Sequence, residues 1–219
     1  KLEYQTVEIT PAIGQIDIFQ KTGQRKLPVL FDKEITIHNS SSIIRHLERI
    51  QIEPNLIPDN PKERSHAQII ENWADTTLAK SINIVFSEEI MKSPELISSL
   101  FPNEISDSMQ KLFVDIPLKI ASQISGLINQ EEKESLKLNL EFLTKIVEKE
   151  NFLVGKELSI ADISIASQLS LLNFPNSSGE NLRGKGCSKY INDPTLNHLF
   201  KWRDSIEEKL KITNHNESF

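Results

Sequence analysis

The stretch LPVLFDKEITIHNS, residues 27–40, decides how the first part of the chain folds. It contains two short runs of strand-forming residues, 29–31 and 35–37, separated by a polar gap of hairpin length. Pro28 has no N–H to donate to a sheet, so it belongs at an edge or at the start of a strand. The stretch therefore predicts a β-hairpin that begins at Pro28 and is followed by a helix that Ser40 opens. The apolar residues of that helix recur at helical spacing: Ile43, Ile44, Leu47 and Ile50.

Both ends of this stretch carry groups that can hold a ligand. A cis bond between Leu27 and Pro28 would leave the N–H and C=O of Leu27 free to pair with an extended peptide. A trans proline that merely starts the strand is the alternative, because cis is the minority state of such bonds. Ser40 is a good N-cap residue, but the helix N-terminus that it opens can also bind a carboxylate. Taken singly, each feature keeps a purely structural explanation.

The residues around the hairpin indicate two domains. Residues 2–9 are rich in β-forming side chains and predict a strand, and a short helix is predicted before Gly23, which suits a C-terminal cap. The first part of the chain thus has the order strand, helix, strand, strand, helix, and a proline-rich linker follows it. We expect a first domain at residues 1–52 and an all-helical domain at residues 60–219.

Helical periodicity continues through most of the second domain. Pro61 suits the first turn of a long helix, and residues 176–186 predict a polar, glycine-rich, flexible loop. The predicted inner face of the long helix consists of Ile70, Ala74, Leu78, Ser81 and Val85. Further helices are predicted at residues 104–127, 136–147, 159–172 and 195–210.

In this order and spacing, the Leu-Pro-Val-Leu segment, the hairpin and the Asn-Ser pair resemble the glutathione-binding half of the glutathione transferase family. The resemblance implies that Pro28 is the cis-proline and that the backbone of Leu27 pairs with the cysteinyl part of glutathione. It implies that Ser40 holds the γ-glutamyl carboxylate. Lys26 could reach the glycyl carboxylate, with a solvated surface lysine as the alternative. Asn39 replaces the usual acidic residue, and an amide accepts more weakly than a carboxylate from the ammonium of glutathione.

The second domain carries an independent resemblance to the same family. FLVG at residues 152–155 and LSIADI at residues 158–163 are similar to its loop-and-helix signature. The residues themselves predict a helix N-terminus here, because Ser159 and Asp162 have the spacing of a capping box. We therefore predict a folding element here, with no catalytic role.

The resemblance implies a fold class and an activity. The fold is a thioredoxin-like α+β domain that lacks its first strand and helix, followed by an all-α helical bundle. The activity is conjugation of glutathione to a small hydrophobic electrophile, or its reduction by glutathione, as in detoxification, by a homodimer. The activating Ser, Tyr or Cys of the family is expected upstream of Lys1, so no catalytic residue is assigned in this chain. Two alternatives stay open: a non-catalytic ligand-binding or protein-interaction module, and a helical interaction domain with incidental strands.

Composition narrows the class of protein. The 219 residues are 38% hydrophobic and carry a net charge of −6, which suits a globular domain and argues against a nucleic-acid partner. The sequence contains no apolar run of about 18 residues, so no membrane-spanning helix is predicted. The five histidines do not have the spacing of metal ligands. The single cysteine, Cys187, fits a reducing cytoplasm and is expected to be a packing or surface thiol. Tyr4 is expected to be a half-buried strand residue, not the activating group.

Overall fold

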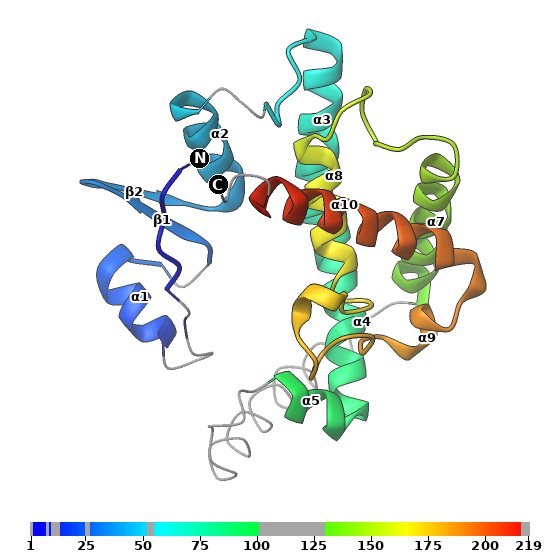
Figure 1. Ribbon diagram of the computed structural model, residues 1–219. Coiled ribbons are helices and arrows are strands. Elements are labelled where there is room, and N and C mark those ends of the chain that lie inside the picture. The colour runs from blue at the N-terminus through cyan, green and yellow to red at the C-terminus, as the bar shows by residue number, and fades with distance from the viewer. Residues whose placement is uncertain are drawn as a thin grey trace. The chain divides into compact units, whose positions relative to one another are not determined.

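The computed structural model forms two compact units, Lys1–Ile57 and Pro58–Phe219 (Figure 1). Within the part of the chain that the structure describes, no helix is both long and apolar enough to cross a membrane. The backbone is described for residues 2–7, 9, 14–24, 27–51, 55–100 and 130–215, and the side chains for all of these except 14–17, 94 and 211–215.

The first unit is built around the predicted hairpin (Figure 1). Strands β1 (Val29–Asp32) and β2 (Ile35–His38) are antiparallel, and their register runs from Val29 opposite His38 to Asp32 opposite Ile35. The connection is the two-residue loop Lys33–Glu34, in which Lys33 has a positive φ of 54°. Positive φ at the first loop residue is a feature of the turns that close two-residue hairpins, so Lys33 adopts the conformation that glycine usually supplies there. Helices α1 (Gly14–Thr22) and α2 (Ser40–Ile50) flank the hairpin in sequence.

The strand predicted at residues 2–9 is wrong for the residues that the structure describes there. Residues 2–7 have no regular secondary structure and are exposed, and Tyr4 is 79% exposed, not half-buried as predicted. Among the described residues the sheet contains only β1 and β2. A strand is stable only when a neighbouring strand takes up its backbone hydrogen bonds, and the β-forming composition of residues 2–7 does not supply that neighbour.

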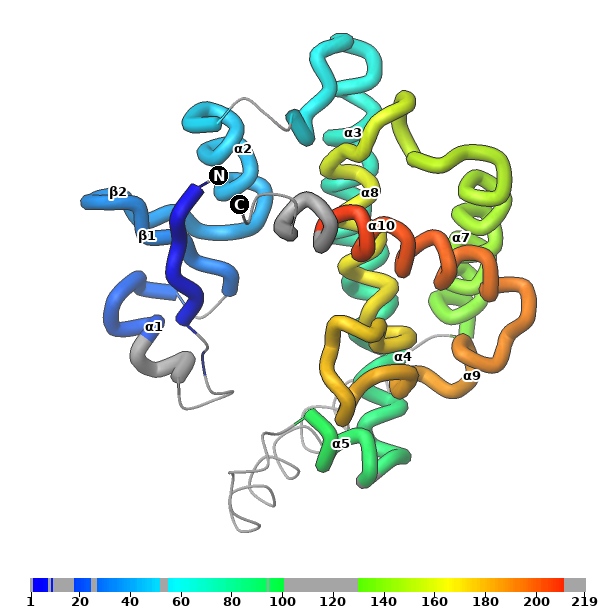
Figure 2. Tube along the Cα trace, in the orientation of Figure 1, coloured from blue at the N-terminus to red at the C-terminus, as the bar shows by residue number. Residues whose placement is uncertain are grey.

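The regular secondary structure of the described residues of the second unit is helical, as the sequence predicted, apart from one isolated bridge between Asn173 and Gly186 (Figure 2). Helix α8 lies at the centre of this unit and packs against both α3 and α10. Its inward side chains Ile165 and Leu169 are fully buried. Within its described residues, the α-helices of this unit are α3 (Pro61–Trp73), α4 (Ala79–Lys92), α5 (Pro94–Leu100), α7 (Gln130–Val147), α8 (Ile160–Leu169), α9 (Ser188–Ile191) and α10 (Asn197–His215).

Helices α3 and α4 are joined by a π-helical segment, Ala74–Leu78. Its wider turns shift the buried face, so that Ala74, Leu78 and Ile82 point inward at intervals of four residues. The predicted inner face is therefore correct at Ala74, Leu78 and Val85, whereas Ile70 and Ser81 are only half-buried.

The remaining helix predictions fare differently. All four apolar residues predicted for the inner face of the helix at 136–147 are buried in α7. Helices α8 and α10 lie where helices were predicted at residues 159–172 and 195–210. The helix predicted at residues 104–127 lies outside the described residues. The four buried side chains of α7 are Leu136, Leu140, Leu143 and Val147.

Candidate glutathione site

The Leu27–Pro28 segment precedes β1 directly. The Leu27–Pro28 peptide bond is cis. Leu27 is 50% exposed, and its backbone makes no hydrogen bond with another described residue. Its N–H and C=O can therefore pair with the backbone of an extended ligand, in the manner of an added strand. Lys26, the basic residue predicted beside this pair, lies outside the described residues.

The second half of the candidate site is the N-terminus of α2. The helix begins at Ser40, but its N-cap is Asn39, whose side-chain Oδ1 accepts the backbone N–H of Ser42 at 2.8 Å. The prediction that Ser40 caps the helix is therefore wrong, because the preceding amide already occupies the capping position. The first turn contains no acidic residue, so the positive end of the helix dipole is not neutralised by the helix's own side chains.

Asn39 has an unusual backbone conformation. Its φ is 61° and its ψ is 150°, a region that glycine adopts readily and that costs other residues about 1–3 kcal/mol. Such strain persists where the surrounding structure enforces it, and it is concentrated at ligand-binding and catalytic positions. The strain at Asn39 therefore marks this turn as a candidate functional position, independently of any sequence motif.

The hairpin register brings the two halves of the site to the same end of the sheet. Val29 follows Pro28 and is paired with His38, which precedes Asn39. The exposed backbone of Leu27 and the N-terminus of α2 consequently flank one edge of a single β-pair. This arrangement suits a short peptide with a free carboxylate: its backbone can pair with Leu27, and its carboxylate can bind at the helix N-terminus.

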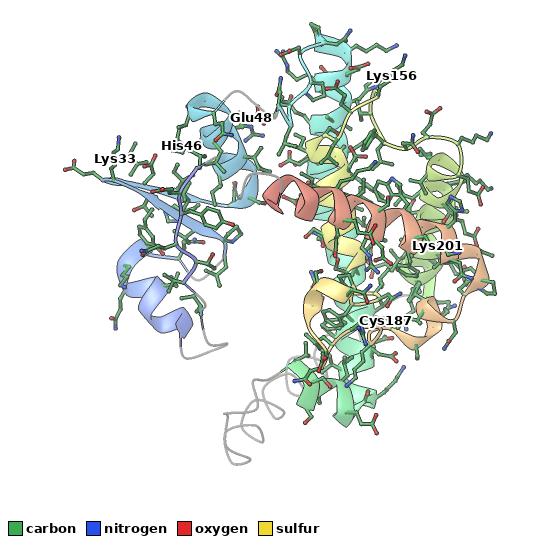
Figure 3. The ribbon with its side chains drawn as sticks, viewed as in Figure 1. Lys33, His46, Glu48, Lys156, Cys187 and Lys201 are labelled. Carbon is green, nitrogen blue, oxygen red and sulfur yellow. The ribbon has the colours of Figure 1, made fainter. Side chains whose placement is uncertain are left out.

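Two side-chain contacts that sequence reasoning missed stabilise this unit. The Gln24 side-chain Nε2 lies 3.0 Å from Nδ1 of His38. At the turn end of the hairpin, Nε2 of His46 on α2 lies 2.7 Å from Oδ2 of Asp32 (Figure 3). Residues 14 positions apart carry no periodic signal in the sequence, so neither pair could have been identified before the hairpin register was known.

Cys187 does not belong to this site. It lies in the second unit directly before α9, where it is only 2% exposed (Figure 3). Burial, aided by the negative charges of Glu89 and Glu88, raises the pKa of the Cys187 thiol to about 12. A thiol that stays protonated at neutral pH is a poor nucleophile, so Cys187 is a packing residue, as the sequence indicated.

We expect Cys187 to resist thiol reagents while the protein is folded. A pKa of about 12 leaves only about one thiol in ten thousand ionised at pH 8, and burial hinders access further. Labelling by Ellman's reagent should be at least about a hundredfold slower in buffer than in urea, and its rate should still be rising at pH 10. Rapid stoichiometric labelling of the folded protein at pH 7 would contradict this assignment.

Comparisons with known proteins agree with this architecture. Residues 125–218 match the family model described as glutathione S-transferase, C-terminal domain. The β-etherase LigF from Sphingobium sp. strain SYK-6 superposes with a TM-score of 0.66 at 20% identity, covering 100% of this chain and 90% of that protein. Glutathione transferase YghU from Streptococcus pneumoniae, solved in complex with glutathione, superposes with a TM-score of 0.55 at 18% identity, covering 94% and 67%.

A curated relative matches two thirds of the chain. FtsZ-localized protein A of Caulobacter vibrioides is 22% identical over 151 residues, which are 67% of this chain and 56% of that protein. The chain thus matches little more than half the length of this relative. Residues 125–218 carry the C-terminal domain of the glutathione transferase family, and the chain as a whole has the glutathione transferase fold. The fold class predicted from the sequence is confirmed, and the predicted family is matched at residues 125–218.

Proposed function

We propose that the chain supplies the glutathione-binding half of a glutathione transferase-like protein. Residues 1–52 form a partial thioredoxin-like domain that binds the tripeptide, and residues 60–219 form the helical domain. The single observation that carries this proposal is the hairpin register, which places the exposed Leu27 backbone and the N-terminus of α2 at one end of the sheet. The proposed glutathione-binding residues are Lys26, Leu27, Pro28, Asn39 and Ser40.

The residues divide the recognition of glutathione among them. The Leu27 backbone pairs with the cysteinyl residue, and the N-terminus of α2 with Ser40 takes the γ-glutamyl carboxylate. Asn39 Oδ1 is already engaged with the N–H of Ser42, so it offers the ammonium of glutathione only its remaining lone pair. We therefore expect weaker affinity for glutathione than an acidic residue at this position would give.

The proposed reaction is nucleophilic transfer from the sulfur of glutathione. The thiol loses its proton to solvent, the thiolate forms a new bond to carbon of a small hydrophobic electrophile, and the leaving group departs with its electron pair. The described side chains of this chain bind the tripeptide and do not activate its sulfur. No described side chain is proposed as the activating Ser, Tyr or Cys, so the proposal assigns this chain the binding of glutathione and does not assign it the activation of the sulfur.

Calorimetric titration with glutathione tests this proposal, using the full-length gene product alongside residues 1–219. We expect millimolar or tighter binding, and we expect Asn39→Asp to tighten it several-fold, because a charge-assisted bond is roughly twice as strong as a neutral one. Asp is an equally good N-cap residue, so the helix start is preserved in this variant. Absence of binding to the full-length protein at about 10 mM glutathione would overturn the proposal.

A non-catalytic binding module is the second candidate. It is favoured by the similarity to a protein named for its localisation with FtsZ and by the neutral Asn39. The two candidates separate in one assay: the enzyme consumes glutathione in the presence of a reactive aryl halide, whereas the module binds glutathione without turnover.

We also propose that the protein is a homodimer. The exposed face of α7 carries an apolar stripe, Leu138, Phe142 and Ile146, each 43–50% exposed. Glu141 and Lys145 flank Phe142, so two α7 helices packed antiparallel about Phe142 would place opposite charges together. Light scattering should give a dimer mass, and Phe142→Glu should give a monomer with an unchanged helical circular dichroism spectrum. An unaltered mass would contradict pairing through α7.

A further inference from the structure

The side chains of Gln24 and His38 join the two segments that carry the proposed site. Gln24 follows α1 and precedes the segment that leads to Leu27, and His38 is the last residue of β2, next to Asn39. The Gln24 Nε2 and His38 Nδ1 atoms lie 3.0 Å apart in a partly buried position. The Gln24 Nε2 group can donate to His38 Nδ1 in the tautomer whose Nδ1 carries no proton.

Both partners of this bond are anchored independently. The α1 helix ends at Gly23, which has a φ of 72° and donates its N–H to the Phe19 carbonyl oxygen at 2.8 Å. Thr22 Oγ1 accepts the Gln24 N–H at 3.3 Å and donates to the Ile18 carbonyl oxygen at 2.7 Å. The backbone of His38 is fixed by its pairing with Val29.

Because each partner is fixed within its own element by other contacts, the bond sets the distance between the end of α1 and the end of β2. It spans the loop that contains Leu27 on one side and adjoins the strained turn at Asn39 on the other. Loss of the bond would free the loop of one restraint while leaving the hairpin register and the start of α2 in place.

We propose that Gln24 and His38 are positioning residues for glutathione. Their bond holds the Leu27 backbone at the spacing from the N-terminus of α2 that one tripeptide must span. This inference rests on the proposed function, and neither residue is assigned contact with the ligand. A chain lacking the bond would still fold, but its two half-sites would fluctuate relative to each other, which weakens binding of a ligand that needs both.

The pair His46 and Asp32 provides a matched control within the same unit. It is also a histidine bond across the hairpin unit, at 2.7 Å, and it ties α2 to the last residue of β1. It differs in location, because Asp32 lies beside the turn at residues 33–34, at the opposite end of the hairpin from Val29 and His38. Breaking it disturbs the unit at the turn end of the hairpin and leaves the pairing of Val29 with His38 in place.

The test compares glutathione dissociation constants of full-length variants by calorimetry. We expect Gln24→Leu and His38→Phe each to weaken binding about five- to tenfold, the value of one hydrogen bond. The double variant should be no weaker than the worse single variant, because both remove the same contact. His38→Gln, whose amide oxygen can accept from Gln24, should restore affinity to within about twofold of the original. His46→Phe should leave affinity within about twofold, even if it lowers the Tm.

Three results would overturn the inference, two of them from the affinities and one from hydrogen exchange. Equal losses of affinity in His38→Phe and His46→Phe would show a general effect of stability, and unchanged affinity in Gln24→Leu would show no effect of the bond. A ligand-free measurement separates this inference from the proposed function. Amide hydrogen exchange at residues 27–32 should quicken in Gln24→Leu while residues 61–73 keep their rates. Unchanged exchange at residues 27–32 overturns the inference whether or not the original protein binds glutathione.

Discussion

Replacing Gly186 by alanine should lower the free energy of unfolding of the helical unit by about 4 kcal/mol or more. Gly186 has a φ of 141°, which side-chain-bearing residues rarely adopt. A Cβ there would lie against the Leu172 carbonyl oxygen, 2.8 Å from the Leu172 carbonyl carbon and 3.1 Å from Cα of Asn173. All three atoms are backbone atoms and cannot rotate away, so the clash must be relieved by moving the chain.

The surrounding bonds prevent that movement. Gly186 forms an isolated bridge with Asn173, and the Cys187 N–H donates to the same Leu172 carbonyl oxygen at 2.8 Å. Arg203 of α10, only 1% exposed, donates through Nη1 to the carbonyl oxygen of Asn173. Displacing the loop would therefore also break a buried charged hydrogen bond, which is among the costlier contacts to lose.

Gly184→Ala is the matched control for this experiment. Gly184 also has a positive φ, 72°, but a Cβ built there meets nothing within 4 Å. Its cost should be limited to the left-handed conformation, about 1 kcal/mol. Urea denaturation followed by circular dichroism measures both variants. Equal midpoints for Gly186→Ala and Gly184→Ala would contradict the steric argument.

The loop that contains these glycines was only partly predictable. Composition correctly indicated a polar, glycine-rich connection at residues 176–186, but it did not indicate the backbone hydrogen bonds that close the loop at its base. Phe174 donates its N–H to the Lys185 carbonyl oxygen at 2.7 Å, and the Gly184 N–H donates back to Phe174 at 2.8 Å. These bonds are formed by backbone atoms, which are the same in almost every residue, so no pattern of side chains in the sequence predicts them.

In the candidate site, features that depend on neighbouring residues in the chain were predictable, whereas contacts between distant residues were not. The hairpin, the start of α2 and the cis Leu27–Pro28 bond agree with a short contiguous motif, because each depends on residues next to one another in the chain. The capping role of Asn39 was missed, since a neighbouring serine is an equally good cap on composition alone. The contact between Gln24 and His38 depends on the hairpin register and could not be derived before the fold.

Asp162 was predictable as a capping residue, but the structure gives it a larger role than that motif implies. Its carboxylate is fully buried and accepts three hydrogen bonds. Oδ2 accepts the Ser159 N–H and the Ser159 hydroxyl, both at 2.9 Å, and Oδ1 accepts the Leu153 N–H at 2.7 Å. The third bond ties the preceding loop to α8, so one side chain fixes both the start of the central helix and its approach.

Asp162→Ala should therefore cost more than a lost cap. It leaves the buried N–H and hydroxyl of Ser159 and the partly buried N–H of Leu153 without this acceptor, and a buried group left unpartnered costs about 1–3 kcal/mol. We expect a loss of about 3–5 kcal/mol in the free energy of unfolding, against about 1 kcal/mol for an ordinary N-cap. Ser159→Ala is the control, because it removes the hydroxyl donor and keeps Asp162 bonded to both N–H groups. Similar losses in the two variants would show that Asp162 acts only as a cap.

The pH dependence of stability provides a second test of Asp162. Burial raises the pKa of its carboxyl group above the usual 3.8, and the hydrogen bonds from Leu153 and Ser159 offset only part of that effect. A raised pKa in the folded state means that the folded protein holds this proton more tightly than the unfolded chain does. The resulting stabilisation is complete below the usual pKa and is lost as the pH rises through the folded value. The Asp162→Asn side chain cannot titrate, so its contribution to stability does not change with pH in this way. As the pH rises from about 3.5 through the folded pKa of Asp162, the original protein should therefore lose unfolding free energy relative to the variant. A difference that stays constant over this range would contradict the raised pKa and leave the three hydrogen bonds as the whole contribution of this residue.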